Sequence, residues 1–212
     1  MPLPAMKNQT FSIRGDGCKI VCVTRVVAGL AKGRHLEVPE TGTRPTSDRV
    51  REALFSSLEH HVGSFASLDI LDLFAGSGAL GLEALSRGAQ RVVLVEKDRR
   101  AIEIIKRNIT KMNIPGALVI NDDVKRLVAA APTRGTFDVV FMDPPYAMPD
   151  DEVQGIVGAL VQQGWLNSHA LLVVERSKGS SLDWPTDWES LSKRDYGGTQ
   201  LHTGVWYGPD RA

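Results

Sequence analysis

Cysteine is scarce in this chain: only Cys18 and Cys22 occur among its 212 residues. They lie close together near the N-terminus, and no second Cys or His pair at metal-ligand spacing accompanies them, which argues against a zinc site. Two cysteines in a chain of this length suit a reducing compartment. We therefore expect a protein that binds no metal and lies in a reducing compartment.

Long apolar runs are also lacking, since none approaches the roughly 20 residues needed to span a bilayer. The N-terminus has no signal-peptide core followed by a small-residue cleavage site. The 42% of hydrophobic residues are nevertheless ample for a core, and the length suits one α/β domain with a small addition. These features predict a soluble cytoplasmic protein with no membrane partner.

A net charge is missing as well, because 25 Lys and Arg balance 25 Asp and Glu. The charge is unevenly placed, however, since residues 1–51 hold nine Lys or Arg against four Asp or Glu. A basic end on a mildly acidic body suggests a polyanion partner for that end. An ordinary solvated surface is the alternative that charge counts alone leave open.

The most informative stretch that is present runs from Asp69 to Gly81. It begins as a short apolar run typical of a buried strand, breaks at three glycines, and continues as a helical pattern. Strand, glycine turn and helix open a nucleotide-binding α/β unit. Glycine suits such a turn because it permits unusual backbone dihedrals and lets a ligand approach the backbone closely.

Strands and helices alternate through the rest of the chain. Apolar runs predict further buried strands at residues 90–96, 117–120, 137–142 and 170–175. Helical periodicity separates them at 98–111, 122–130 and 150–163, and runs at 187–195 and 199–207 predict a closing antiparallel hairpin. This alternation predicts a mostly parallel sheet with helices on both faces.

The N-terminal quarter has a different character. Residues 1–22 carry no clear periodicity and are interpreted as a poorly ordered leader. Residues 23–47 are expected to hold a basic loop and a β-hairpin, in which Arg25–Gly29 pairs with Arg34–Val38. The main domain is then expected to span residues 48–212 and to open with a helix.

Acidic residues follow the carboxyl ends of the predicted strands, where parallel sheets bind ligands. Glu96 lies 20 residues after Gly76, and an acid there can accept both hydroxyls of a ribose, in NAD and in S-adenosylmethionine alike. Asp123 could accept an adenine amino group while the backbone near Val124 meets a ring nitrogen. Asp122 competes for that role, and helix capping is an alternative for both acids.

The sequence Asp143-Pro144-Pro145-Tyr146 follows another predicted strand and is the most specific signal. Two prolines lack backbone donors and fix a stiff loop, which presents carbonyl oxygens and the Asp143 carboxylate. Such a corner suits a substrate that offers hydrogens, as an exocyclic amine does. Tyr146 supplies a flat face on which a base can stack, worth about 1–3 kcal/mol.

At this point the sequence resembles a known family. The stretch Asp72–Gly78, Glu96 and the Asp143–Tyr146 motif look like those of class I S-adenosylmethionine-dependent amino-methyltransferases. More narrowly, Arg25–Gly29, Thr43–Phe55 and Gly78–Ala89 resemble the RsmD family, whose members methylate the N2 amine of one guanine in bacterial 16S ribosomal RNA. The resemblance covers about residues 23–207. The leader departs from the family pattern, and Asn121-Asp122-Asp123-Val124 stands where Gly-Asp-Ala is commoner.

The resemblance implies a Rossmann-like class I methyltransferase fold, with a mostly parallel seven-stranded sheet and a small N-terminal β-hairpin extension. It implies S-adenosylmethionine as cofactor, held by Asp72, Phe74, Ala75, Gly76, Ser77, Gly78, Glu96, Lys97, Asp123 and Val124. Catalysis would fall to Asp143, Pro144 and Tyr146. The RNA backbone would be held by Arg25, Lys32, Arg34, Arg44, Arg49 and Arg51. The expected partner is 16S rRNA, in the small ribosomal subunit or an assembly intermediate, and the protein is expected to act as a monomer.

Three other functions compete with this one. A DNA adenine-N6 methyltransferase uses the same proline loop for its amine. A dinucleotide-dependent oxidoreductase uses the same glycine turn, although the proline loop argues against it. A non-catalytic ribosome-assembly binding protein would keep the fold without the activity.

Overall fold

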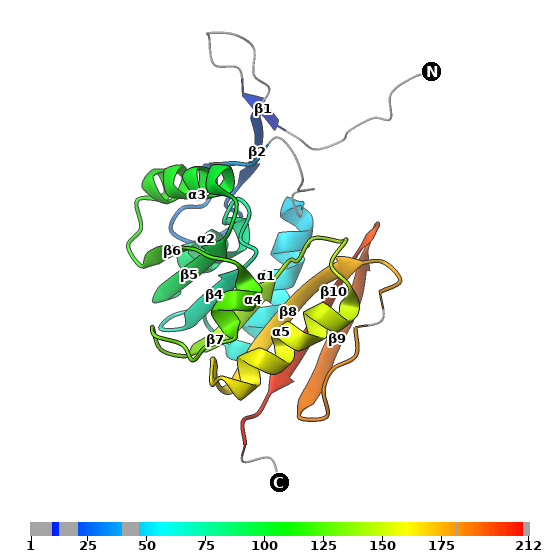
Figure 1. Cartoon of the computed structure of the whole chain (residues 1–212). Helices are drawn as coiled ribbons and strands as arrows, with labels where there is room; N and C mark the ends of the chain where they lie inside the picture. Colours follow the sequence, from blue (N-terminus) through cyan, green and yellow to red (C-terminus); the bar gives the residue numbers. More distant parts are fainter. Residues whose placement is uncertain (1–9, 13–20, 40–46, 181, 210–212) are drawn as a thin grey trace.

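The central element is a seven-stranded sheet in the order β6-β5-β4-β7-β8-β10-β9 (Figure 1). The computed structural model describes residues 10–12, 21–39, 47–180 and 182–209. In sheet order the strands are β6 Ala117–Asn121, β5 Arg91–Glu96, β4 Asp69–Leu73, β7 Phe137–Met142, β8 Leu166–Ser177, β10 Thr199–Trp206 and β9 Trp188–Tyr196. All strands predicted from the apolar runs are therefore present.

Strand direction follows the prediction. Strand β4 pairs in parallel with β5 and β7, β5 with β6, and β7 with β8, whereas β10 is antiparallel to both β8 and β9. The chain runs outward from β4 through β5 to β6 and then returns to the other side of β4 with β7. This reversal makes the carboxyl ends of β4 and β7 the point at which open α/β sheets bind ligands.

Helices cover both faces because side chains alternate along each strand. On β5, Val92 and Leu94 belong to one buried cluster and Val93 and Val95 to the other. The first cluster includes side chains of α1 Asp48–Val62, α2 Ala79–Ser86 and α3 Arg99–Met112. The second includes side chains of α4 Val124–Val128 and α5 Asp150–Gln162. No helix within the described ranges combines the length and apolarity needed to cross a bilayer.

The predicted N-terminal hairpin is present, but its first strand lies elsewhere. Strand β2 Val21–Arg25 pairs antiparallel with β3 His35–Glu37, so that the expected strand at Arg25–Gly29 is wrong beyond its first residue. A further short strand, β1 Thr10–Ser12, pairs with β2 and lies within residues 1–22, for which the sequence predicted no element. The result is a small three-stranded antiparallel sheet beside α3 (Figure 1).

Beyond Val26, which still pairs with Gly33 and Arg34, the segment after β2 is held by α2. The buried Glu83 carboxylate accepts the backbone N–H groups of Val27 and Ala28 at 2.7 and 3.0 Å. Gly29 has φ +82°, and a Cβ there would lie 1.9 Å from the Ser86 carbonyl oxygen. The motifs Arg25–Gly29 and Gly78–Ala89 therefore pack against each other through these contacts. Both motifs thus have a structural role.

Candidate active site

The glycine turn leaves β4 in an unusual backbone conformation. Phe74, Gly76 and Gly78 have φ values of 61°, 55° and 77°, a region that only glycine enters without cost. Phe74 has a Cβ and still adopts this conformation, as residues at functional sites often do. The Ala75 N–H donates to the Val95 carbonyl at 3.0 Å and so fixes the turn to β5.

Asp72 lies beneath this turn, with 2% of its side chain exposed. Its Oδ2 accepts the Gly81 N–H at 2.9 Å, and a Cβ on Gly81 would lie 2.7 Å from Val92 Cγ1. Burial, with a smaller contribution from the negative charge of Glu96 and against the opposing Gly81 N–H, raises the pKa of Asp72 to about 7. Asp72 thus supports the turn from below.

Glu96 ends β5 with its carboxylate held by three backbone N–H groups. Oε2 accepts the Gly76 N–H at 2.9 Å, and Oε1 accepts the N–H groups of Lys97 and Asp98 at 2.8 and 2.9 Å. A carboxylate offers about four lone-pair sites, so Oε2 keeps one for a ligand hydroxyl. The carboxylate is therefore fixed in place at the wall of a cavity before any ligand arrives.

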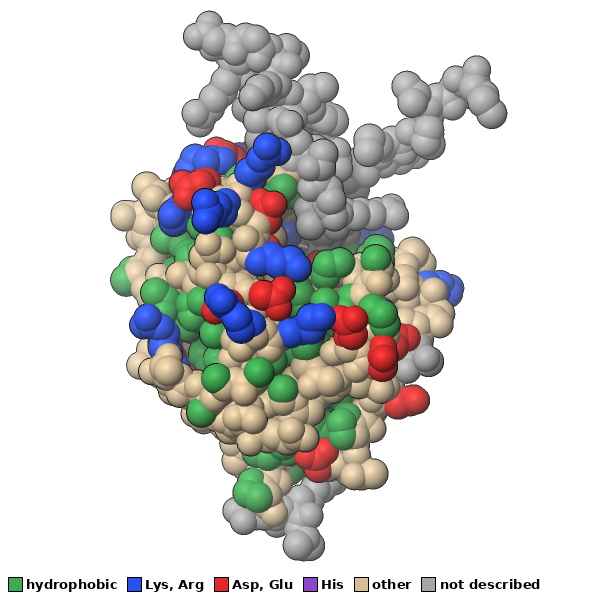
Figure 2. Space-filling model, viewed as in Figure 1, with side chains coloured by type: hydrophobic (Ala, Val, Ile, Leu, Met, Phe, Trp, Pro, Cys, Tyr) green, Lys and Arg blue, Asp and Glu red, His purple; other side chains and the backbone are tan. Residues whose placement is uncertain are grey.

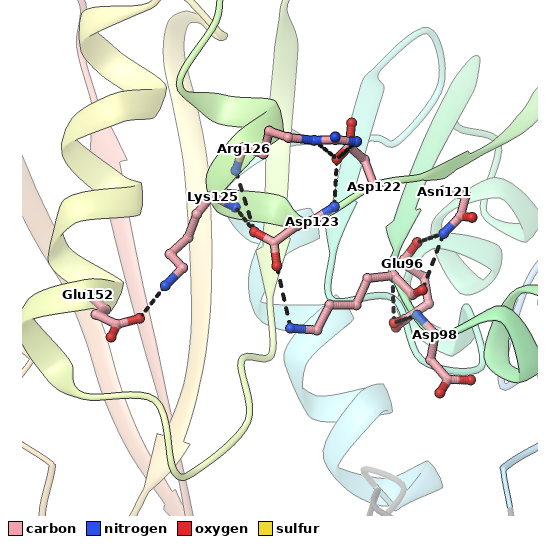
Figure 3. Close-up of polar contacts among 9 residues, drawn as sticks. Glu96, Asp98, Asn121, Asp122, Asp123, Lys125, Arg126 and Glu152 are labelled. Carbon is pink, nitrogen blue, oxygen red and sulfur yellow. Dashed lines mark hydrogen bonds and ion pairs between the residues drawn. The ribbon is translucent and has the colours of Figure 1, made fainter.

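Asp122 and Asp123, the two candidates for the adenine amine, lie in different environments (Figure 3). Asp123 caps α4, because its Oδ1 accepts the N–H groups of Lys125 and Arg126, while its Oδ2 lies 3.4 Å from Lys97 Nζ. Asp122 lines the cavity instead, together with Val124. The Asp122 carboxylate is engaged as well, because its Oδ1 accepts the Asp123 N–H and pairs with Arg126, each at 2.7 Å. The assignment of Asp123 to the adenine therefore stays a prediction, and the place of Asp122 in the cavity wall makes it the other candidate.

The Asp143–Tyr146 loop begins directly after β7. Burial raises the pKa of Asp143 well above its ordinary value, the negative charges of Glu175 and Asp72 raise it further, and Arg176 opposes them. The Tyr146 side chain is half exposed, and its hydroxyl donates to Glu175 Oε1 at 3.3 Å and lies 2.9 Å from Thr199 Oγ1. The phenol is therefore tethered to β8 and β10 at the edge of the site.

A cavity of about 1130 Å³ joins these features. Its walls include eight residues predicted from the sequence: Phe74, Gly76, Glu96, Lys97, Val124, Asp143, Pro144 and Tyr146. The glycine turn and the proline loop therefore face one space, as the proposed chemistry requires. Five other predicted cofactor residues lie outside the walls, and support the turn or cap a helix: Asp72, Ala75, Ser77, Gly78 and Asp123.

Three residues of the site were missed by sequence reasoning. Glu37 and Glu175 line the cavity. The fully buried Asn108 accepts the Glu37 N–H and donates to the carbonyls of Glu37 and Ser77, which ties the N-terminal sheet to the glycine turn. Glu175 could have been found, because it ends a predicted strand as Glu96 does, whereas nothing local marks Asn108.

Four acidic residues lie toward the carboxyl ends of four adjacent strands: the register puts Glu96, Asp143 and Glu175 at one level and Asp72 two residues deeper, opposite Leu94 and Phe141. In spatial order along β5, β4, β7 and β8 they are Glu96, Asp72, Asp143 and Glu175, called the carboxylate row below. The residue two positions before each member belongs to the same buried cluster: Leu94, Ile70, Phe141 and Val173. The period-2 alternation of strands therefore places all four carboxylates toward the same face of the sheet.

The predicted RNA-contacting cations fall into different environments. Arg51 is a correction: its side chain is 1% exposed and donates to Thr24 Oγ1, Asp48 Oδ1 and the Arg25 carbonyl, so it cannot reach a phosphate. Arg25 is exposed and pairs with Asp48 at 2.8 Å. Arg34 is exposed and donates to the last carbonyls of α3.

Two further predicted cations are exposed. Lys32 and Arg49 project from the surface, while Arg44 lies outside the described residues. At the cavity mouth, Lys97, Arg99, Arg100 and Arg107 add cations that the sequence reasoning had not assigned to RNA. Figure 2 shows Lys and Arg side chains interleaved with Asp and Glu on this side of the molecule, over α3 and α4.

Comparison with known proteins agrees with the family resemblance that the sequence motifs indicated. The family model described as conserved hypothetical protein 95 matches residues 24–205. Ribosomal RNA small subunit methyltransferase D of Haemophilus influenzae is 37% identical over 90% of this chain and 94% of its own length. The chain belongs to the RsmD family. The protein of the same name from Escherichia coli K12 is 38% identical over 77% of this chain and 80% of its own length.

Solved structures agree with this membership. The Escherichia coli protein yhhF superposes with a TM-score of 0.76 at 33% identity, covering 88% of this chain and 99% of the other. RsmD-family membership makes the chain a methyltransferase. The expected Rossmann-like methyltransferase fold with its small N-terminal antiparallel sheet is confirmed.

Proposed function

We propose that the protein transfers a methyl group from S-adenosylmethionine to the exocyclic N2 amine of one guanine in 16S rRNA of the small ribosomal subunit. The observation that carries the proposal is the single cavity shared by the glycine turn with Glu96 and by the Asp143–Tyr146 loop. A cofactor at the first and a nucleobase at the second would meet inside it. The names of the RsmD-family relatives from Haemophilus influenzae and Escherichia coli supply the small-subunit rRNA.

The residues present fit this cofactor. Glu96 keeps a lone pair for a ribose hydroxyl, and Asp122 and Val124 line the region expected for an adenine ring. The carboxylate row places four acidic groups beside the glycine turn, which favours a cationic sulfonium over the pyrophosphate of a dinucleotide. When bound, S-adenosylmethionine supplies an activated methyl group, whose carbon–sulfur bond breaks as the bond to the amine nitrogen forms.

The chain's own residues then hold and orient the amine. Asp143 and the Pro144 carbonyl are acceptors without a competing donor, so they suit the two hydrogens of an amine. Accepting both hydrogens turns the nitrogen lone pair out of the base plane, toward the donor. Positioning the nitrogen in this way contributes more to the rate than any further activation, because the methyl group needs none. Asp143 takes up the proton that the nitrogen sheds.

The base must leave its helix to reach this corner. A paired guanine cannot offer its N2 amine to a pocket, so it is flipped or taken from a single strand. The Tyr146 ring gives the base a surface for stacking, and the bonds of its hydroxyl to Glu175 and Thr199 hold that ring in place.

The RNA backbone would be held by exposed cations of the N-terminal sheet, of α1 and of the cavity rim. Of the cations predicted from the sequence, Arg25, Lys32, Arg34 and Arg49 are exposed and suit this role. Lys97, Arg99 and Arg100 would extend the contact along the cavity rim. Because such binding releases counterions, affinity for RNA is expected to fall steeply with salt.

Labelled methyl transfer tests the proposal. Small subunits reconstituted with unmodified 16S rRNA, free 16S rRNA and duplex DNA are each incubated with the protein and radiolabelled S-adenosylmethionine, and the modified nucleoside is identified and mapped. N2-methylguanosine at one position of 16S rRNA is the expected product. Label confined to adenine in DNA would instead establish the adenine-N6 alternative.

The variant Asp143→Ala separates catalysis from cofactor binding. Transfer should fall by at least about 100-fold, as expected when a positioning acceptor and proton acceptor are both lost. Binding of S-adenosylhomocysteine, measured by calorimetry, should change little. Equal loss of both would remove Asp143 from the catalytic role.

A further inference from the structure

Glu175 is a cavity residue to which the proposed chemistry has so far given no task. It is 5% exposed, it lines the cavity, and its Oε1 accepts the Tyr146 hydroxyl at 3.3 Å. The parallel register pairs Met142 with Val174, so Asp143, directly after β7, lies opposite Glu175 of β8. Neighbouring strands lie about 4.8 Å apart, which puts the two carboxylates within reach of one planar base.

The edge of guanine that carries N2 has a particular pattern. The N2 amine offers two hydrogens, and the adjacent N1 offers a third, so the edge consists of neighbouring donors. Adenine differs, because its N6 amine is next to an N1 that carries a lone pair and no hydrogen. A corner with one acceptor group accommodates either amine, whereas a corner with two adjacent acceptors accommodates only the guanine edge.

We propose that Glu175 reads the base: its carboxylate accepts the N1–H of guanine while Asp143 and the Pro144 carbonyl accept the N2 hydrogens. This inference rests on the function proposed above and names the residue that selects guanine. With adenine in the same corner, the N1 lone pair would face a carboxylate. The repulsion and the unmade bond would both disfavour that base.

The order of the carboxylate row agrees with this layout. Glu96 lies at the cofactor end, Asp143 follows beyond Asp72, and Glu175 lies farthest from the cofactor. In a guanine whose N2 points toward the cofactor, N1 is the next edge atom away from it. Asp143 is therefore placed to accept from N2, and Glu175, the next acid away from the cofactor, is placed to accept from N1.

The Tyr146 bond strengthens the assignment. It fixes Glu175 Oε1 against the residue proposed to stack on the base, so that the stacking surface and the edge reader are held as one unit. A carboxylate with about four lone-pair sites can serve both the phenol and the base.

The test replaces the base rather than only the residue. Once the target guanine has been mapped, small subunits are prepared with 2-aminopurine at that position, which keeps the 2-amine but carries a lone pair at N1. Wild-type protein should methylate guanine at least about 100-fold faster than 2-aminopurine in single-turnover experiments, since sites built around a hydrogen bond strongly reject analogues that lack it.

The variant Glu175→Gln should lower the ratio of the guanine rate to the 2-aminopurine rate by about 10-fold or more. A glutamine oxygen still accepts the Tyr146 hydroxyl, and its amide can donate to the N1 lone pair of 2-aminopurine. Thr199→Val is the matched control, because it removes the other partner of the Tyr146 hydroxyl and leaves Glu175 unchanged. It should slow both bases alike and leave the ratio unaltered. Binding of S-adenosylhomocysteine reports that each variant is folded.

The outcomes separate this inference from the proposed function. A wild-type protein that methylates no guanine in the subunit overturns the proposed function. A protein that methylates guanine, but with a ratio near one for wild type, overturns only the role of Glu175. The same holds if Glu175→Gln binds the cofactor product and keeps the wild-type ratio.

Discussion

Asp72 offers a test of the electrostatics that underlie the site. It is 2% exposed and belongs to the carboxylate row, and burial raises its pKa to about 7 from an ordinary value of 3.8. The folded protein therefore binds this proton more tightly than the unfolded chain does. The stability that Asp72 contributes is fully present below about pH 4 and is lost progressively as the pH rises to 7.

The size of the effect follows from the pKa. One pKa unit corresponds to about 1.4 kcal/mol, so a rise of about three units destabilises the folded protein by about 4 kcal/mol above pH 7. Asp72→Asn removes this titration and keeps an oxygen for the Gly81 N–H. The new amide nitrogen needs an acceptor, and leaving it without one would cost about 1–3 kcal/mol. A net gain of about 2 kcal/mol above pH 7 is therefore expected.

Thermal unfolding of the unliganded protein from pH 5 to pH 8 measures the gain. For a chain of this length, about 2 kcal/mol raises Tm by about 4–8 °C. The decisive quantity is how the difference between variant and wild type changes with pH. Between pH 5 and 7 it should grow by about 2 kcal/mol, whatever the amide nitrogen costs, since that cost does not titrate.

A Tm difference that is the same at pH 5 and pH 8 would refute the reasoning. A second measurement links the same charge to the proposed function. Asp72→Asn should weaken binding of S-adenosylmethionine more than binding of S-adenosylhomocysteine, because only the first carries a positive sulfur. Equal losses for both ligands would mean that the charge of Asp72 does not act on the cofactor.

Two further predictions concern the N-terminal sheet. Arg51→Ala should lower the free energy of unfolding by about 2–3 kcal/mol in denaturant titrations, because it removes a buried guanidinium and its hydrogen bonds to Thr24, Asp48 and the Arg25 carbonyl. Arg49→Ala should leave stability unchanged and reduce both RNA affinity and its salt dependence. If Arg51→Ala and Arg49→Ala destabilised the protein equally, the assignment of Arg51 to a structural role and of Arg49 to the exposed surface would be wrong. Asn108→Ala should cost about 3 kcal/mol and weaken cofactor binding as measured by calorimetry, since it removes the bonds between Glu37 and the glycine turn; unchanged cofactor affinity would rule out that coupling.

The sequence predicted the sheet well because its signals are local. Apolar runs, glycines and the Asp143–Tyr146 motif each lie within a few residues, and each marked its strand or turn correctly. The main error, the strand expected at Arg25–Gly29, has a non-local cause. Val27 and Ala28 resemble strand residues, but their N–H groups are satisfied by Glu83, which is more than fifty residues away.

Arg51 illustrates the same limit for the site. Its charge and its place beside Arg49 suggested a solvent-facing phosphate contact. In the structure Thr24, the Arg25 carbonyl and Asp48 surround it, and two of these come from β2, whose position was not predicted. A charged side chain can be buried when such partners are assembled around it, and no local pattern reports their presence.

The carboxylate row shows what topology adds to the chain order. Along the sequence the acids occur as Asp72, Glu96, Asp143 and Glu175, and each alone could be a cap or a surface acid. The reversal at β4 reorders them in space, so that Asp72 comes to lie between Glu96 and Asp143. Asp72 then raises the pKa of Asp143, and Glu96 that of Asp72, which destabilises the empty site. A cationic donor and a base edge made only of donors would relieve that repulsion together, so the same arrangement that costs stability selects both ligands.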